Sequence, residues 1–212
     1  MYIEQLERDL LKQGGQQTID HIYKVAELMK KFALAINEDA DAWYYGGFLH
    51  DAGKFYVPKC ILESTNRLSA QEYKCVRKHV DAGIGLIKAI YGLSDEKKKT
   101  AIDCADYHHA WYNGKEYSVS EKGGYSRTNA VKLSGNQIPL AARCCAICDV
   151  YDAITSKRSY SDAQSSEKAI KILINEAKEG HFDYVLTCKF INKVLGVDLK
   201  NYKELLVAWR HK

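Results

Sequence analysis

Histidine and aspartate residues recur along this chain at nearly even steps. The groups are separated by 28 or 29 residues and are, in order, His21, His50-Asp51, His79 and His108-His109. A step of this length allows each group to lie on a different helix, and Asp149 follows on another apolar segment. Imidazole and carboxylate groups together suit divalent transition metals such as iron, manganese or zinc. The spacing therefore predicts a helical fold whose helices bring metal-binding side chains to one place.

The apolar residues repeat with the period of an α-helix, and the chain has only two prolines. One apolar stripe runs from Ile22 to Ile36, with His21 beside it at the edge of the core. Ser69 and Glu72 have the spacing of a capping box, which predicts a helix that begins there and carries His79. We predict an all-α fold whose further helices cover about 40–51, 70–87, 94–109, 139 onward, 166–179, 184–195 and 199–210.

The chain has no internal repeat or linker, so we predict a single domain over 1–212, with a core at about 18–195 and a C-terminal helix at about 199–210. Residues 112–137 are rich in Gly, Ser and Asn and have no apolar period, which predicts a long loop inserted after the His-His helix. Loops of this length are uncommon in compact domains unless they are functional or disordered. We expect residues 119–135 to form a lid or a surface for a protein partner.

Composition excludes several classes of protein. The N-terminal residues lack the apolar core of a signal peptide, and no apolar run approaches the ~20 residues that span a bilayer. A net charge of +4 suits a small anionic nucleotide substrate but is too dispersed for a nucleic-acid polymer. Seven cysteines without a repeating frame indicate reduced thiols, and Cys145 and Cys148 lie in an apolar segment that predicts buried side chains. We predict a cytoplasmic protein without a membrane partner, and its oligomeric state stays open.

The two doublets favour two metal ions over one. Adjacent residues of a helix point about 100° apart, so His50 and Asp51 cannot serve one ion in the same way. The same holds for His108 and His109. Two neighbouring ions, with a carboxylate that touches both, can clamp a phosphate for in-line attack. The doublets therefore predict a binuclear hydrolase rather than a single structural zinc.

Five segments, which together extend over about residues 18–192, resemble a known family. They are FLHDAGKFYVPKCIL, KHVDAGIGLI, YHHAWYNGKEYS, IPLAARCCAICDVYDAITSKRSY and GHFD. In this order they resemble the HD superfamily of metal-dependent phosphohydrolases, and in particular its HD-GYP branch. The resemblance implies an all-helical domain that hydrolyses cyclic di-GMP at a centre of two or three metal ions.

The resemblance also implies roles for individual residues. Lys54 would contact the scissile phosphate, and Asp51 and Lys54 would be the catalytic residues. Arg158 would grip a phosphate of the substrate, and Tyr117 is the tyrosine of the family signature that would contact it. The implied metal ligands are His21, His50, Asp51, His79, His108, His109 and Asp149.

Departures from the family pattern affect the substrate side more than the metal side. Three-metal members have Glu four residues before the first His, where this chain has Gln17, so we expect two ions. Iron or manganese fits the ligand set best, and zinc and nickel also fit. The signature lacks its Glu, Asp and Pro, which are here Ala110, Asn113 and Ser118, and Ser161 stands where many members carry a second basic residue.

Three functions follow from these observations. The first is a phosphodiesterase that hydrolyses a cyclic dinucleotide, cyclic di-GMP or a similar one, through a metal-bridged hydroxide. The second is a phosphohydrolase that acts on another nucleotide or phosphoester, which would account for the altered signature. The third is a degenerate module that binds a ligand or partner without turnover. The complete ligand set argues against the third, because buried polar groups without partners are costly.

Overall fold

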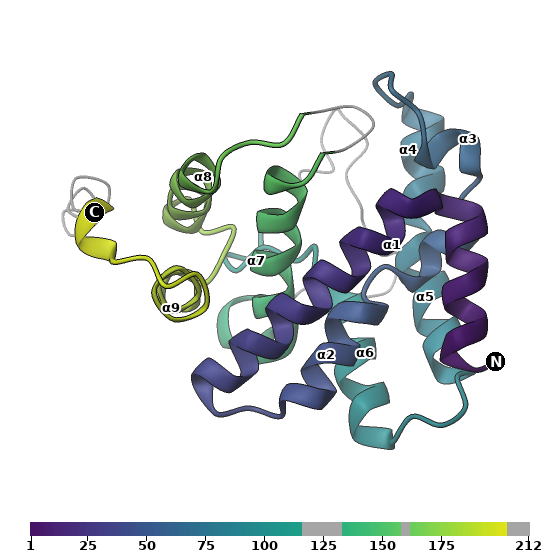
Figure 1. Cartoon of the computed structure of the whole chain (residues 1–212), viewed down its shortest axis with the longest axis horizontal. Coiled ribbons are helices and arrows are strands. Elements are labelled where there is room, and N and C mark those ends of the chain that lie inside the picture. The colour runs from purple at the N-terminus through teal and green to yellow at the C-terminus, as the bar shows by residue number, and fades with distance from the viewer. Residues whose placement is uncertain (116–132, 158–161, 203–212) are drawn as a thin grey trace.

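The structure is a computed structural model and describes residues 1–115, 133–157 and 162–202. In these ranges every regular element is a helix, so the predicted all-α fold is confirmed (Figure 1). In chain order the elements are α1 (Ile3–Ile36), α2 (Ala40–Leu49), η1 (Ala52–Tyr56), α3 (Lys59–Leu62), α4 (Ala70–Arg77), α5 (His79–Lys88), α6 (Asp95–Tyr107), η2 (Gly135–Gln137), α7 (Leu140–Thr155), α8 (Ser166–Lys178), α9 (Tyr184–Lys189), η3 (Phe190–Val194) and η4 (Leu199–Tyr202).

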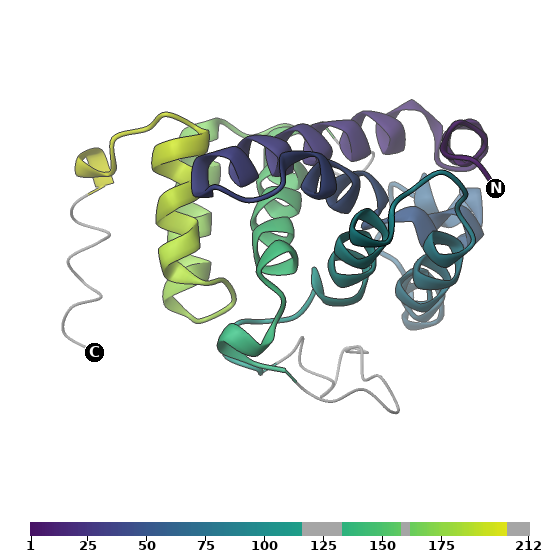
Figure 2. The same ribbon diagram turned by 90° about the horizontal axis from the view of Figure 1, so that it is seen from below.

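Helix α1 crosses the molecule and contributes to both of its hydrophobic clusters (Figures 1 and 2). Met29 and Phe32 pack in the first cluster, with residues of α7, α8, α9 and η3. Ile19 and Ile22 pack in the second cluster, with residues of α2, η1, α5 and α6. Because one helix belongs to both clusters, it fixes α7 relative to α2, α5 and α6. Those elements carry the predicted metal ligands.

The N-terminal part of α1 bends away from the rest at Gly15 (Figure 1). Gly15 has φ 67° and ψ −177°, a conformation that is accessible to glycine and strained for other residues. No helix was predicted for these first residues. In the structure Leu6 and Leu10 are fully buried in the second cluster. The hydrophobic core therefore extends to residues before 18.

The predicted single helix over 70–87 is wrong in one respect, because it is broken at Lys78 into α4 and α5. At the break η1 packs very closely on α5. A Cβ added to Gly53 would lie 1.8 Å from the carbonyl oxygen of His79, so only glycine allows this approach. The break leaves His79 as the first residue of α5. The predicted capping box of Ser69 and Glu72 is confirmed at the start of α4.

Other predicted boundaries differ from the structure by a few residues. Helix α2 ends at Leu49, two residues before the predicted end, and α9 continues as a π-helix over Phe190–Val194. Residues 116–132 lie outside the described part of the chain, and with them most of the predicted lid or partner surface over 119–135. Residues 203–212 of the predicted C-terminal helix also lie outside it. Among the described residues, no helix combines the length and apolarity needed to cross a membrane.

Candidate metal centre

The structure brings all seven predicted ligands together. Three groups of side chains have ligand atoms that all lie within 4.8 Å of one another. These groups are His79, His108 and His109; His21, His50 and Asp149; and His50, Asp51 and His108. His50 and His108 each belong to two groups, so the three groups form one continuous cluster. That each residue binds metal stays a prediction. The cluster combines imidazole nitrogens and carboxylate oxygens, the ligand atoms that a divalent transition metal requires.

Most of these side chains lie at or near a helix terminus, and five of them are buried. His50 and His108 are the C-terminal caps of α2 and α6, and His79 begins α5. Asp51 precedes η1. His50 and Asp51 therefore lie at a junction between two helices, whereas they were predicted from the sequence to lie on one helix. The exposed fraction is between 0 and 4% for His21, His50, Asp51, His79 and His108.

Three of the histidines are oriented by backbone carbonyl groups. The Nδ1 atom of His50 lies 2.6 Å from the oxygen of Gly47, and that of His79 lies 2.7 Å from the oxygen of Val76. His108 Nδ1 lies 2.9 Å from the oxygen of Cys104. A carbonyl oxygen can only accept, so each Nδ1 carries the proton and donates it. The Nε2 lone pair of each ring therefore points to the cluster and is available to a metal ion.

His21 is oriented by a carboxylate. Its Nδ1 lies 2.7 Å from Oδ2 of Asp152, on α7. Its Nε2 faces the cluster, at 3.2 Å from Oδ1 of Asp149 and 3.6 Å from Oδ2 of Asp51. A carboxylate behind a metal-binding histidine fixes the ring and raises its basicity. No role for Asp152 was predicted from the sequence. Its spacing of three residues from Asp149, which puts both on one face of the helix, is the signal that could have found it.

Asp51 lies between the two parts of the cluster. Its Oδ2 is 3.6 Å from Nε2 of His21 and 3.3 Å from Nε2 of His50. Its Oδ1 is 3.4 Å from Nε2 of His79 and 3.9 Å from Nε2 of His108. The two oxygens of one carboxylate thus face different histidines. This is the arrangement that a carboxylate bridging two ions requires.

The unpaired atoms of the cluster fit metal ions. Four buried atoms in it have no hydrogen-bond partner: Nε2 of His50, His79 and His108, and Oδ1 of Asp51. Leaving one such group buried and unpaired costs about 1–3 kcal/mol. The four are good ligand atoms for a divalent transition metal. A metal centre accounts for all of them at once.

The two carboxylates in the cluster are ionised. Burial raises the pKa of Asp51, but the charge of Lys54 and the hydrogen bond with His21 outweigh it and hold that pKa well below its usual value. Burial likewise raises the pKa of Asp149, and the hydrogen bond and charge of His21 reverse the effect. Lys54, on η1, makes a close ion pair with Oδ2 of Asp51. Its ammonium group therefore lies at the edge of the predicted metal centre.

The histidines divide into two kinds by their protonation. Burial lowers the pKa of His79 and lowers that of His108 well below 6.5. Burial also acts to lower the pKa of His21. Hydrogen bonds with Asp149, Asp152 and Asp51 outweigh it, however, and raise that pKa to about 10. His79 and His108 are therefore neutral imidazoles, whereas His21 is held as an imidazolium until a metal ion displaces its proton.

The segment that follows His109 is anchored on the turn between α8 and α9. Trp111 stacks on His181 with ring centroids 3.7 Å apart, and the amide of Asn113 donates to the oxygen of Gly180 at 2.8 Å. The Asn113 side chain donates to the oxygen of Glu179 at 3.0 Å. Asn113, which replaces the Asp of the family signature, thus bonds to backbone groups of the turn between α8 and α9. The sequence analysis did not predict this contact.

Two predicted substrate contacts, Tyr117 and Arg158, lie outside the described residues, as does Ser161. Lys54 is the one predicted substrate contact that the structure describes, and it lies against Asp51.

Comparison with known proteins identifies the family. The HD domain family model matches residues 18–154, which include all seven predicted ligands. The chain belongs to the HD domain family. The predicted membership of the HD superfamily, in an HD-GYP-like branch, is confirmed.

Two curated relatives are named after cyclic dinucleotides. The chain is 31% identical over 186 residues to 3′3′-cGAMP-specific phosphodiesterase 1 of Vibrio cholerae. This match covers 86% of this chain and 39% of that protein. It is 32% identical over 151 residues to a cyclic di-GMP phosphodiesterase of Pseudomonas aeruginosa. This match covers 71% of this chain and 32% of that protein. The chain thus spans about a third of the length of these relatives.

The fold is also similar to that of a solved HD domain. The phosphodiesterase PgpH of L. monocytogenes, crystallised with cyclic-di-AMP, superposes with a TM-score of 0.64 at 20% identity. The superposition covers 91% of this chain and 94% of that one. At this identity the likeness concerns the fold.

Proposed function

We propose that this chain is a metal-dependent phosphodiesterase domain that hydrolyses a cyclic dinucleotide. The observation that carries the proposal is the position of Asp51, whose two carboxylate oxygens face different histidines among four unpaired buried ligand atoms. This arrangement favours two ions over one. The names of the relatives support the reaction and the class of substrate.

Two divalent ions, iron or manganese in the first place, would be held by the seven residues of the cluster. One ion would use His21, His50 and Asp149, the other would use His79, His108 and His109, and Asp51 would bridge them. Bound there, they would supply Lewis acidity to activate water and to polarise a phosphate. The ionised carboxylates and the neutral imidazoles of His79 and His108 are already in the protonation state that binding requires.

Lys54 would stabilise the negative charge that develops on the phosphate. Its side chain is 24% exposed, so the ammonium group reaches the surface of the cluster while it remains close to Asp51. Preorganised charge of this kind is commonly a large contribution to catalysis. Arg158, three residues beyond the end of α7 in the sequence, would bind the second phosphate, because a guanidinium suits bidentate phosphate binding.

The altered signature bears on selectivity. Asn113 is engaged with backbone groups of the α8–α9 turn, and Ser161 replaces a basic residue. We therefore expect slower or less selective hydrolysis of cyclic dinucleotides than is typical of the branch, with a linear dinucleotide as first product. The same departures support the second candidate, a phosphohydrolase for another nucleotide or phosphoester.

The test is anaerobic purification, metal analysis, and an assay of the metal-loaded chain. Cyclic di-GMP, 3′3′-cGAMP and cyclic di-AMP are compared with mononucleotides and a generic phosphodiester. Cleavage of a cyclic dinucleotide to its linear form supports the proposal. Good metal occupancy with phosphate release from a mononucleotide alone would favour the second candidate. Metal binding without any hydrolysis would favour a non-catalytic module.

A further inference from the structure

His21 differs from His50, His79 and His108 in what lies behind its ring. Those three donate from Nδ1 to backbone carbonyls, which the helices hold in place. The Nδ1 of His21 faces the side-chain carboxylate of Asp152 instead. A side chain has rotamers of its own, so a carboxylate can orient the ring only if it is itself held.

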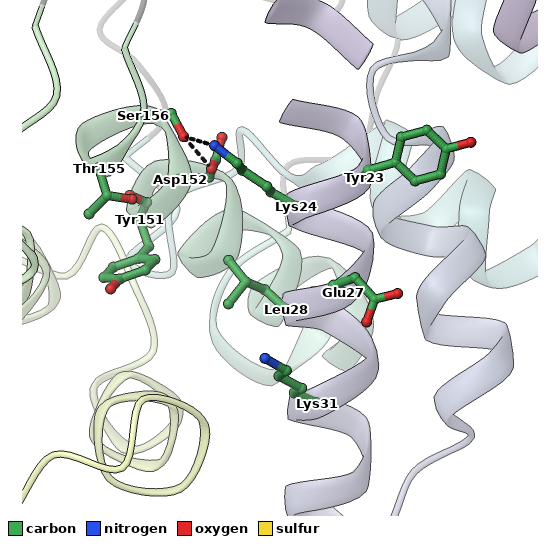
Figure 3. Close-up of a pocket in the computed structure, with 9 residues that line it drawn as sticks. All are labelled: Tyr23, Lys24, Glu27, Leu28, Lys31, Tyr151, Asp152, Thr155 and Ser156. Carbon is green, nitrogen blue, oxygen red and sulfur yellow. Dashed lines mark hydrogen bonds between the residues drawn. The ribbon is translucent and has the colours of Figure 1, made fainter. Parts of the chain in front are cut away.

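Asp152 is held by a chain of hydrogen bonds that leads to the surface. Ser156, the C-terminal cap of α7, donates from its hydroxyl to Oδ1 of Asp152 at 2.7 Å. Lys24 donates to the same hydroxyl oxygen at 3.0 Å (Figure 3). The two oxygens of Asp152 thus have different tasks, since Oδ2 meets His21 and Oδ1 meets Ser156.

The spacing of these residues suits two packed helices. His21 and Lys24 lie one turn apart on α1, and Asp152 lies one turn before Ser156, the C-terminal cap of α7. Asp152 is 3% exposed, whereas Lys24 lies at the surface. Lys24 and Ser156, at the outer end of this series of hydrogen bonds, line an open groove of about 400 Å³ between α1 and α7 (Figure 3). The hydrogen bonds therefore connect solvent with the rear of a buried imidazole.

We propose that Asp152, Ser156 and Lys24 are positioning residues that hold His21 in the orientation needed to bind a metal ion. This inference rests on the proposed role of His21 as a ligand. Asp152 fixes the ring and keeps the proton on Nδ1, so that Nε2 remains for the ion. Ser156 fixes Asp152, and the charge of Lys24 offsets that of the buried carboxylate.

The alternative is that these bonds only join α1 to α7. A residue with that role would change the stability of the fold without changing the metal affinity of the folded protein. Loss of a hydrogen-bonding partner behind a metal ligand typically costs 10–100-fold in metal affinity. Metal affinity and thermal stability, measured on the same variants, therefore separate the two explanations.

The experiment titrates the metal-free full chain with Mn²⁺ and follows binding by calorimetry, with metal content measured after desalting. Asp152→Asn should weaken one of the two sites about 10–100-fold and leave the other unchanged. Ser156→Ala and Lys24→Met should weaken the same site by a smaller factor. Ser156→Thr and Lys24→Arg, which keep the hydroxyl and the charge, should restore it.

Tyr151→Phe is the matched control. Tyr151 lies on the same helix and lines the same groove, but its hydroxyl meets Ser166 at 2.9 Å and is not part of the chain to His21. This variant should bind Mn²⁺ like the wild type. Ser156→Ala keeps the test informative if Asp152→Asn does not fold, because Ser156 lies at the edge of the groove.

Two results would overturn the inference, and they can be told apart. If the wild type binds two ions and every variant binds them equally well, the positioning role is wrong while the proposed function stands. A drop in melting temperature in those variants would then assign the bonds to helix packing. If the wild type binds no Mn²⁺, the proposed metal centre fails and the positioning role fails with it.

Discussion

The two ends of the predicted metal centre are built in different ways. At one end, His79 and His108 are neutral imidazoles whose Nδ1 atoms donate to backbone carbonyls. At the other end, His21 lies among three carboxylates and has its pKa raised to about 10. Asp51 joins the ends through its two oxygens. One cluster thus holds one end ready for an ion and the other end in a protonated state.

This difference has a consequence for metal binding. The imidazole end needs no proton to leave before an ion binds, whereas the His21 end must release one. We therefore expect the two sites to differ in how their affinities depend on pH.

Asp51→Ala should remove metal from both ends and abolish hydrolysis. Asp51 is the residue whose oxygens face both groups of histidines, so no neighbour replaces it. Metal content after desalting and the rate of cyclic dinucleotide cleavage measure the effect. Asp81→Ala, which removes an exposed carboxylate of α5, is the control and should retain both. A variant that still held two ions would mean that the ends are independent.

Single histidine substitutions should separate the ends. His79→Ala should lower the metal content from about two ions to about one, and His21→Ala should do the same at the opposite end. His79 and His21 belong to different groups of ligand atoms, and these two groups have no member in common. Competition between Mn²⁺ and a coloured chelator would resolve the remaining site. If either variant lost both ions, the centre would behave as one unit.

Much of this arrangement follows from the sequence, because it depends on local patterns. The even spacing placed the histidine groups on separate helices, and the capping box of Ser69 located the start of α4. The break at Lys78 could not be predicted, because the apolar stripe continues across it and the close approach of Gly53 to α5 at this point is a tertiary contact. The spacing of Asp152 from Asp149 puts both on one face of α7, but the contact of Asp152 with His21 depends on how α1 packs against α7, which a single sequence does not give.

Lys54→Ala should lower turnover by roughly 10²-fold while metal content stays unchanged. Lys54 contacts Asp51 but is not a ligand type for these ions, so its loss should affect the reaction more than the site. Steady-state kinetics and metal analysis on the same preparation test this. Lys59→Ala, which removes a 53% exposed lysine paired with Glu63, is the matched control. Loss of metal in the Lys54 variant would assign the residue to the structure of the centre.

The smallest effect concerns the stability of the metal-free protein, and it has opposite signs at the two ends. Because folding raises the pKa of His21, protonated His21 adds to the free energy of unfolding. This contribution is fully present below pH 6.5 and is lost as the pH rises through about 10. Because folding lowers the pKa of His108, the contribution of neutral His108 to the free energy of unfolding is present above pH 6.5. It is lost as the pH falls below 6.5.

The melting temperatures of the chelator-treated wild type, His21→Gln and His108→Gln should therefore be measured between pH 5 and pH 10.5. In a chain of this size, each kcal/mol of stability shifts the melting temperature by about 2–4 °C. The gap between wild type and His21→Gln should shrink as the pH rises. The gap between wild type and His108→Gln should shrink as the pH falls. Equal behaviour of the two variants across this range would contradict the division of the centre into a carboxylate end and an imidazole end. That division depends on Asp152 and Asp149 facing one histidine while backbone carbonyls face the other.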